Sequence, residues 1–76
     1  MINQKSREIS YNKLWKLLID RGMKKKELQE ISGISAASIA KLGRNGNVTV
    51  EVLVKICQAL DCEIGDICET ESRKAD

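Results

Sequence analysis

Five cations near the middle of this 76-residue chain have the side chains and the spacing to bind phosphate groups. Lysine and arginine are frequent partners of phosphate oxygens, and three consecutive lysines are unfavourable at a helix start unless an anion lies nearby. A lysine run that faces only solvent is the competing interpretation for the first three positions. The five cations are Lys24, Lys25, Lys26, Lys41 and Arg44.

The composition argues against an enzyme. The 76 residues include no histidine, which excludes a catalytic histidine and a histidine metal site. There is no glycine-rich phosphate loop and no carboxylate pair in an apolar stretch, and a chain of this length does not easily enclose a substrate-sized pocket. We therefore expect no catalysis, no cofactor and no metal.

Three cysteines, Cys57, Cys62 and Cys68, are the remaining reactive groups. Their odd number and the lack of CxxC spacing predict free thiols, with Cys57 as a small core residue. Zinc binding or redox sensing is the alternative, and a zinc site would need a fourth ligand. Free thiols, no secretory signal and no apolar run of membrane length together predict a cytoplasmic protein with no membrane partner.

Charge is distributed unevenly along the chain, although the net charge is only +2. Residues 1–46 hold ten lysines and arginines against four acidic residues, which gives +6. Residues 47–76 hold three against seven, which gives −4. The first half can therefore face phosphates while the second faces solvent or a partner protein.

The stretch from Lys24 to Leu42 is typical of two short helices joined by a tight turn. Two pairs of apolar residues, each three positions apart, give each helix an apolar side. Gly33 can end the first helix in a left-handed conformation, and the Ser35 side chain can cap the second. Two helices joined around a glycine form the unit that places a recognition helix in the DNA major groove. The apolar pairs are Leu28 with Ile31 and Ile39 with Leu42.

Further helices are expected on both sides of this unit. Ser10 is the candidate cap of a first helix that ends at Gly22, and Thr49 caps a fourth helix that ends near Leu60. A fifth, single helical turn should follow near Ile64. The expected fold is all-α, a compact five-helix bundle that contains a helix-turn-helix.

The two ends of the chain are expected to lie outside this bundle. Residues 1–9 are polar and predict a flexible N-terminal arm, and residues 69–76 predict a disordered tail, which leaves 10–68 as the domain. Contact of the arm with the DNA backbone through Lys5 and Arg7 is the alternative.

An ordered set of positions extends over most of the chain and carries a family resemblance. The positions are Leu14 and Leu17, Gly22-Met23, Leu28, Gly33-Ile34-Ser35, Ile39, and Thr49-Val50 with Leu53, Ile56-Cys57 and Ala59-Leu60. Over about residues 10–68 the chain resembles the Cro/CI-type helix-turn-helix domain of the XRE family of transcriptional regulators, which has a lambda-repressor-like fold. It looks closest to small single-domain members whose first helix opens as Ile9–Trp15 does here.

The resemblance implies a sequence-specific DNA-binding regulator that acts as a repressor and inserts the third helix into the major groove. It also implies a homodimer that reads two half-sites about one helical turn apart. With no ligand-binding domain, no small-molecule effector is expected. The implied DNA contacts, together with the flanking lysines, are Lys24, Lys25, Lys26, Ser35, Ala36, Ala37, Ser38, Lys41 and Arg44.

The chain departs from the family pattern on the recognition helix. Ala36 and Ala37 stand where the family often has long polar residues, and alanine can contact only the thymine methyl group. We therefore expect modest base discrimination, with affinity carried mainly by the five cations. Ser32 is a second departure, and burial against the turn would lead its hydroxyl to bond a carbonyl of its own helix.

Two questions stay open at this level. A protein-interaction or antitoxin-like accessory module that retains the fold is the alternative function, favoured by the two alanines. The dimer surface could involve Trp15 and Ile19 of the first helix or the segment Ile64–Cys68, and core packing is the other role for Trp15.

Overall fold

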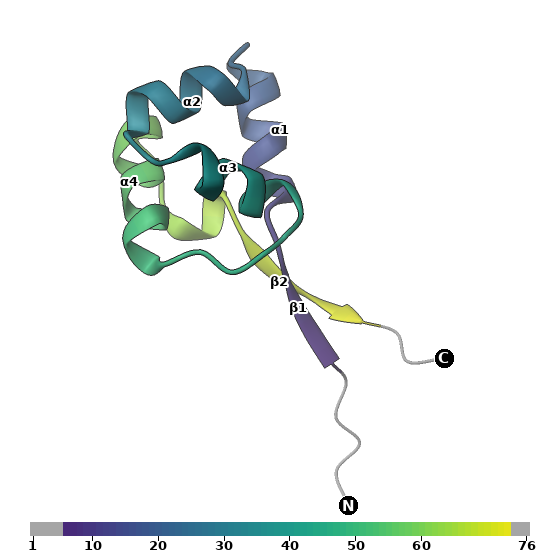
Figure 1. Cartoon of the computed structure of the whole chain (residues 1–76). Coiled ribbons are helices and arrows are strands. Elements are labelled where there is room, and N and C mark those ends of the chain that lie inside the picture. Colours follow the sequence, from purple (N-terminus) through teal and green to yellow (C-terminus); the bar gives the residue numbers. More distant parts are fainter. Residues whose placement is uncertain (1–5, 74–76) are drawn as a thin grey trace, which may run out of the picture.

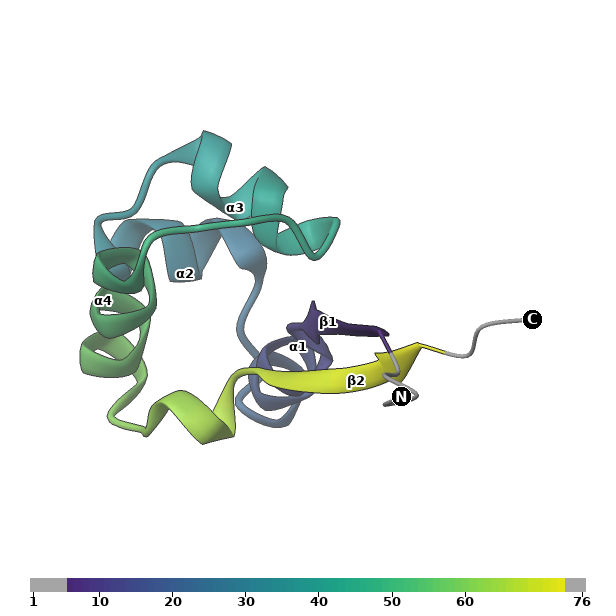
Figure 2. The same cartoon turned by 90° about the horizontal axis from the view of Figure 1, so that it is seen from below.

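The computed structural model describes residues 6–73, which form four α-helices, one turn of 3-10 helix and two β-strands (Figure 1). The helices make up the body of the molecule, and the two strands lie side by side and extend away from it (Figures 1 and 2). In chain order, the elements are β1 Ser6–Ser10, α1 Asn12–Asp20, α2 Lys25–Ser32, α3 Ala36–Gly43, α4 Val50–Leu60, η1 Ile64–Asp66 and β2 Glu69–Arg73.

The prediction of an all-α five-helix bundle is therefore wrong. The fifth helix is a single 3-10 turn, η1, and β1 pairs with β2 in an antiparallel two-stranded sheet. The register places Ser6 opposite Arg73 and Ser10 opposite Glu69. These strands pair residues about sixty positions apart, so the sequence contains no hairpin turn between them that would predict the pairing. Their side chains are mostly polar, so they also lack the apolar alternation of a half-buried strand.

The sheet occupies much of the expected arm and tail. Residues 6–9 and 69–73, expected to be flexible or disordered, form most of β1 and all of β2. The Arg7 guanidinium links the strands, donating to the Thr70 hydroxyl and to the Thr70 carbonyl at 2.9 Å each. The rest of the expected arm and tail lies outside the described residues, and the domain boundaries at residues 10 and 68 stay predictions.

The core receives at least one fully buried side chain from every α-helix. A chain of this size has room for only one small core. The helices therefore share one buried apolar cluster. The fully buried apolar side chains are Leu14, Leu28, Leu42, Ile56, Leu60 and Ile67.

The spacing of apolar residues in the sequence predicts only some of the residues that form this core. Leu28 and Leu42 are fully buried, but Ile31 is 52% exposed and Val50, at the start of α4, is 71% exposed. Residues three apart on a helix differ by about 60° around its axis, so a short helix buries one and exposes the other. Spacing alone therefore does not identify which apolar residues at the start of α4 are buried.

The capping predictions for α3 and α4 are confirmed. The Ser35 hydroxyl accepts a hydrogen bond from the Ser38 N–H at 3.1 Å, and the Thr49 hydroxyl accepts one from the Val52 N–H at 3.2 Å. The expected back-bond of Ser32 is also present, its hydroxyl donating to the Leu28 carbonyl at 2.6 Å. The N-cap position of α1 is Tyr11 and not Ser10, because the helix begins one residue later than predicted. The Ser10 hydroxyl still accepts a hydrogen bond from the N–H of Asn12, the first residue of the helix, at 3.3 Å.

The helices of the described segment are short. Within residues 6–73 none has the length and apolar character needed to cross a membrane.

Candidate nucleic-acid interface

The α2–α3 unit has the helix-turn-helix geometry that the sequence predicts. α2 ends at Gly33, whose φ of 76° is readily available only to a residue without a Cβ. Ile34 is buried and anchors the turn, and Ser35 then caps α3, which begins at Ala36. Figure 2 shows α3 along the side of the helical body that lies opposite η1. The turn thus holds α3 at the periphery while Leu42 ties it to the core.

The exposed side of α3 carries most of the predicted base-reading positions. Ala36, Ala37 and Lys41 are exposed on the helix, and Arg44 is exposed at its C-terminal end. Ser38 differs, because it is half-buried and its hydroxyl accepts a hydrogen bond from the Ser35 hydroxyl at 3.1 Å. The free surface of α3 is therefore small and methyl-rich, with cations at its C-terminal end.

The three lysines of the predicted phosphate cluster are exposed at the N-terminus of α2. The Lys24 N–H donates to a Glu27 carboxylate oxygen at 2.9 Å, which places one negative charge in the first turn of this helix. One acidic side chain does not neutralise three lysines. This end of α2 therefore remains a cationic surface beside α3.

Lys25 is placed more tightly than its neighbours. Its ammonium lies 4.5 Å from the centre of the Trp15 ring, in cation–π geometry. The same nitrogen lies 3.7 Å from the position that a Cβ on Gly43 would take, so it also sits beside the end of α3. Lys25 thus connects α1, α2 and α3, and it keeps donors free for a phosphate oxygen. Trp15 itself is half-buried against the core.

Two contacts that the sequence analysis missed fix the loop that carries Arg44. The Tyr11 N–H donates to the Asn45 side-chain oxygen at 3.1 Å, and the Tyr11 hydroxyl donates to the Gly46 carbonyl at 3.3 Å. Asn45 has a positive φ of 55°. The sequence contains no local signal for these two contacts, because their partners lie 34 and 35 positions apart.

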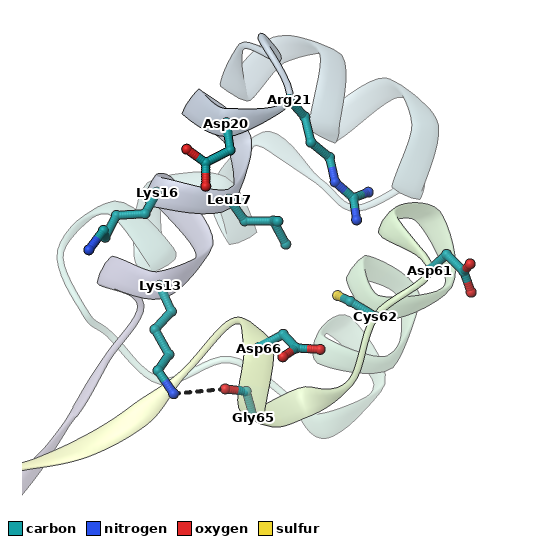
Figure 3. Close-up of a pocket in the computed structure, with 9 residues that line it drawn as sticks. All are labelled: Lys13, Lys16, Leu17, Asp20, Arg21, Asp61, Cys62, Gly65 and Asp66. Atoms are coloured by element: carbon teal, nitrogen blue, oxygen red, sulfur yellow. Dashed lines mark hydrogen bonds between the residues drawn. The ribbon is translucent and has the colours of Figure 1, made fainter.

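A cleft of about 420 Å³ opens away from this interface, between α1 and the α4–η1 region (Figure 3). Its walls carry both signs of charge, with lysines on α1 and aspartates beyond α4. Two of its cations already bond to backbone carbonyls. Lys13 donates to the Gly65 carbonyl at 3.0 Å, and Arg21 donates to the Leu60 carbonyl at 2.6 Å. Lys13 thus joins α1 to η1, and Arg21 joins the end of α1 to the C-terminal end of α4.

The three thiols are free, as predicted. Cys68 is buried and its thiol donates to the Ile64 carbonyl, whereas Cys57 and Cys62 are half-buried at the end of α4. The Cys62 N–H donates to the Cys57 carbonyl at 3.1 Å and closes that helix. Within residues 6–73, no group of three or more cysteine and acidic side chains is arranged to hold a metal ion.

Alkylation of Cys57 is expected to be slow at neutral pH. Burial, followed by the neighbouring Cys62, raises the pKa of the Cys57 thiol to about 11. Because the thiolate is the reactive form, its fraction at pH 8 should be on the order of one in a thousand. Iodoacetamide labelling followed by peptide mass spectrometry should show a rate that climbs from pH 8 to 11. Rapid labelling of folded protein at pH 7 would contradict this pKa.

Comparison with known proteins agrees with this geometry. The Cro/C1-type HTH DNA-binding domain family matches residues 13–72. An uncharacterized HTH-type transcriptional regulator, YozG of Bacillus subtilis (strain 168), is 41% identical over 58 residues, which are 74% of this chain and 69% of that protein. The crystal structure of the transcriptional regulator VanUg (Form II) is 52% identical, with a TM-score of 0.84 over 96% of both chains.

Proposed function

This chain belongs to the Cro/C1-type helix-turn-helix DNA-binding family, as a small XRE-type regulator, and from that premise we propose that it represses transcription by inserting α3 into the major groove. The matched family is one of DNA-binding domains and not of enzymes. The observation that carries the proposal is the position of α3, held at the periphery by Ile34 and Leu42 with its alanines and cations exposed.

Affinity in this proposal comes mainly from phosphate contacts. Lys24, Lys25 and Lys26 at the start of α2 and Lys41 and Arg44 at the end of α3 are all exposed. They flank the two alanines of α3 on the cationic half of the chain. Because alanine reads only thymine methyl groups, the base-specific part of the binding energy should be small. Ser35 and Ser38 bond to each other and would contribute little to direct base reading.

We further propose that the chain acts as a homodimer on a two-fold site in the cytoplasm. Two copies would present two α3 helices to half-sites about one helical turn apart, as paired helix-turn-helix proteins do. Free thiols fit a reducing compartment. No small-molecule effector is part of this proposal.

Substitution of Ala37 by glutamate tests the insertion of α3. A carboxylate at this exposed position would meet the phosphate backbone in the groove, so we expect affinity for duplex DNA to fall about tenfold or more. Ser72→Glu is the matched control, because it adds the same charge to an exposed position on β2, outside both α3 and α4. Fluorescence anisotropy with a labelled duplex measures both. Equal losses in the two variants would indicate a general charge effect and would count against insertion of α3.

The alternative is a protein-interaction or antitoxin-like module that retains the fold. The methyl-rich surface of Ala36 and Ala37 favours it, because it offers so few base-reading groups. The basic surface around α2 and α3 favours the DNA-binding function. The absence of duplex binding at low salt would move the assignment to the alternative.

A further inference from the structure

Three of the five large apolar side chains that are most exposed among the described residues belong to one part of the molecule. Val50 and Val54 lie one turn apart on α4 and are 71% and 42% exposed. Ile64, at the start of η1, is 39% exposed. We call these three side chains the α4 face. Exposed apolar side chains that gather in one place are typical of interaction surfaces, whereas isolated ones are ordinary.

A shallow groove of about 260 Å³ connects α4 to η1 within this face. Val54 and Ile64 line it together with the half-buried Cys57 and Cys62. Aliphatic and sulfur atoms thus form most of its floor, with Gln58 and Glu63 at its polar edge. An aliphatic side chain from a second protein surface would fit such a groove.

The charges beside the face suit a second copy of the same chain. Glu51 and Lys55 are exposed and stand one turn apart on α4, in step with Val50 and Val54. When two such helices pack antiparallel about a two-fold axis, Glu51 of each copy comes opposite Lys55 of the other. Val50 of one then lies beside Val54 of the other. A two-fold interface requires this kind of self-complementarity.

The position of α4 also allows both recognition helices to remain accessible. In Figures 1 and 2, α4 lies at one flank of the helical body, at the end remote from the two strands. Figure 2 shows α3 on a different side of that body. A second copy seated against the flank would leave both α3 helices uncovered.

The two surfaces suggested by the sequence fit a dimer less well. In the segment Ile64–Cys68, Ile67 and Cys68 are buried, so only Ile64 contributes. Ile19 is 75% exposed, but the hollow beside it is lined by Lys24 and Lys25. A second copy docked there would bring two cationic clusters together and cover residues needed for phosphate contacts.

We propose that the α4 face is the surface through which two copies of this chain pair about a two-fold axis. This inference rests on the proposed function, which needs two copies on one DNA site. Three side chains form a small apolar centre, well below the roughly 800 Å² that each partner buries in a stable interface. The free dimer is therefore weak, with a dissociation constant in the micromolar range or above, and DNA strengthens it by holding two copies side by side.

Sedimentation velocity over a concentration series up to about 1 mM tests the pairing directly. The wild-type chain should move from monomer to dimer, and Val54→Asp should raise the dissociation constant about tenfold or more by burying a carboxylate in the interface. Ile19→Asp is the matched control, since it makes the same change at a more exposed apolar position on α1. A monomer throughout the series, or equal losses in both variants, would overturn the proposal.

A charge exchange provides a second test, which avoids placing a charge in the apolar centre. Glu51→Lys alone should weaken the dimer, and so should Lys55→Glu alone, because each leaves like charges opposed. The double variant Glu51→Lys/Lys55→Glu should restore it. Failure of the double variant to recover would overturn the antiparallel pairing of the α4 helices.

Binding to a generic duplex at low salt separates this proposal from the proposed function. Val54→Asp should still bind as a monomer, because α2 and α3 are unchanged, but the binding of two copies should lose cooperativity. A dimer that forms normally but does not bind DNA would refute the proposed function and leave the pairing intact. DNA binding whose cooperativity is unaffected by Val54→Asp would refute the pairing.

Discussion

Replacement of Leu42 by alanine is expected to lower the free energy of unfolding by about 3 to 5 kcal/mol. Leu42 is fully buried and is the only residue of α3 in the fully buried core. The substitution removes its aliphatic contacts and leaves a cavity that α3 cannot easily fill, because Gly33 and Ser35 fix the start of the helix.

The expected loss is a large fraction of the total free energy of unfolding. A chain of 76 residues has a total stability of roughly 4 to 11 kcal/mol at 0.05 to 0.15 kcal/mol per residue. Loss of Leu42 would remove a large part of it, with a fall in Tm of about 15 °C or more. Urea denaturation followed by circular dichroism measures the change.

Ile31→Ala provides the comparison for Leu42→Ala. Ile31 is also an aliphatic residue of the helix-turn-helix, but it is 52% exposed. Its replacement should cost about 1 kcal/mol or less. Similar losses in the two variants would contradict the assignment of Leu42 to the core.

The other large effect concerns DNA affinity in the triple variant Lys25→Ala/Lys41→Ala/Arg44→Ala. In a dimer these substitutions remove six cations from the proposed interface, so affinity at about 50 mM salt should fall a hundredfold or more. The dependence on salt should weaken at the same time, because fewer counterions are released. Fluorescence anisotropy of a labelled duplex measures both quantities.

The loss of DNA affinity should depend on where the removed cation lies, and not only on how many cations are removed. Lys16→Ala removes one exposed cation from α1, and Lys41→Ala removes one from α3. Only Lys41→Ala should reduce affinity by about threefold or more and lower the salt dependence. Equal effects of these two single substitutions would indicate attraction to the whole protein and not to the α2–α3 surface.

The helix-turn-helix was predictable because its signals are local. A glycine that ends α2 and a serine that caps α3 act within a few residues of their own positions, and both act as predicted. The same holds for Thr49 at the start of α4. Capping involves residues close together in the sequence, so these signals can be found without the tertiary structure.

The two strands could not be predicted for the opposite reason. Ser6–Ser10 and Glu69–Arg73 stabilise each other from the two ends of the chain. Neither stretch has an apolar face, and paired residues such as Ile9 and Thr70 lie about sixty positions apart in the chain. Long-range pairing of polar segments leaves no local periodicity to detect.

For the candidate site, the contact of its residues with DNA stays a prediction, and the sequence did not indicate how their side chains are held. The exposure of Ala36, Ala37 and Lys41 follows from helical periodicity once Leu42 is assigned to the core. The stacking of Lys25 on Trp15 joins two helices whose mutual orientation no local pattern specifies. It is a consequence of tertiary packing.

The salt dependence of duplex binding by the wild-type chain tests the central claim most directly. Anisotropy with a generic duplex at about 50 and 200 mM salt gives the slope of log affinity against log salt. Six to eight phosphate contacts by a dimer predict a slope of roughly −5 to −7, and a fall in affinity of about a thousandfold or more. Affinity that is nearly independent of salt, or no binding at the lower salt concentration, would contradict a DNA-binding regulator that depends on these cations.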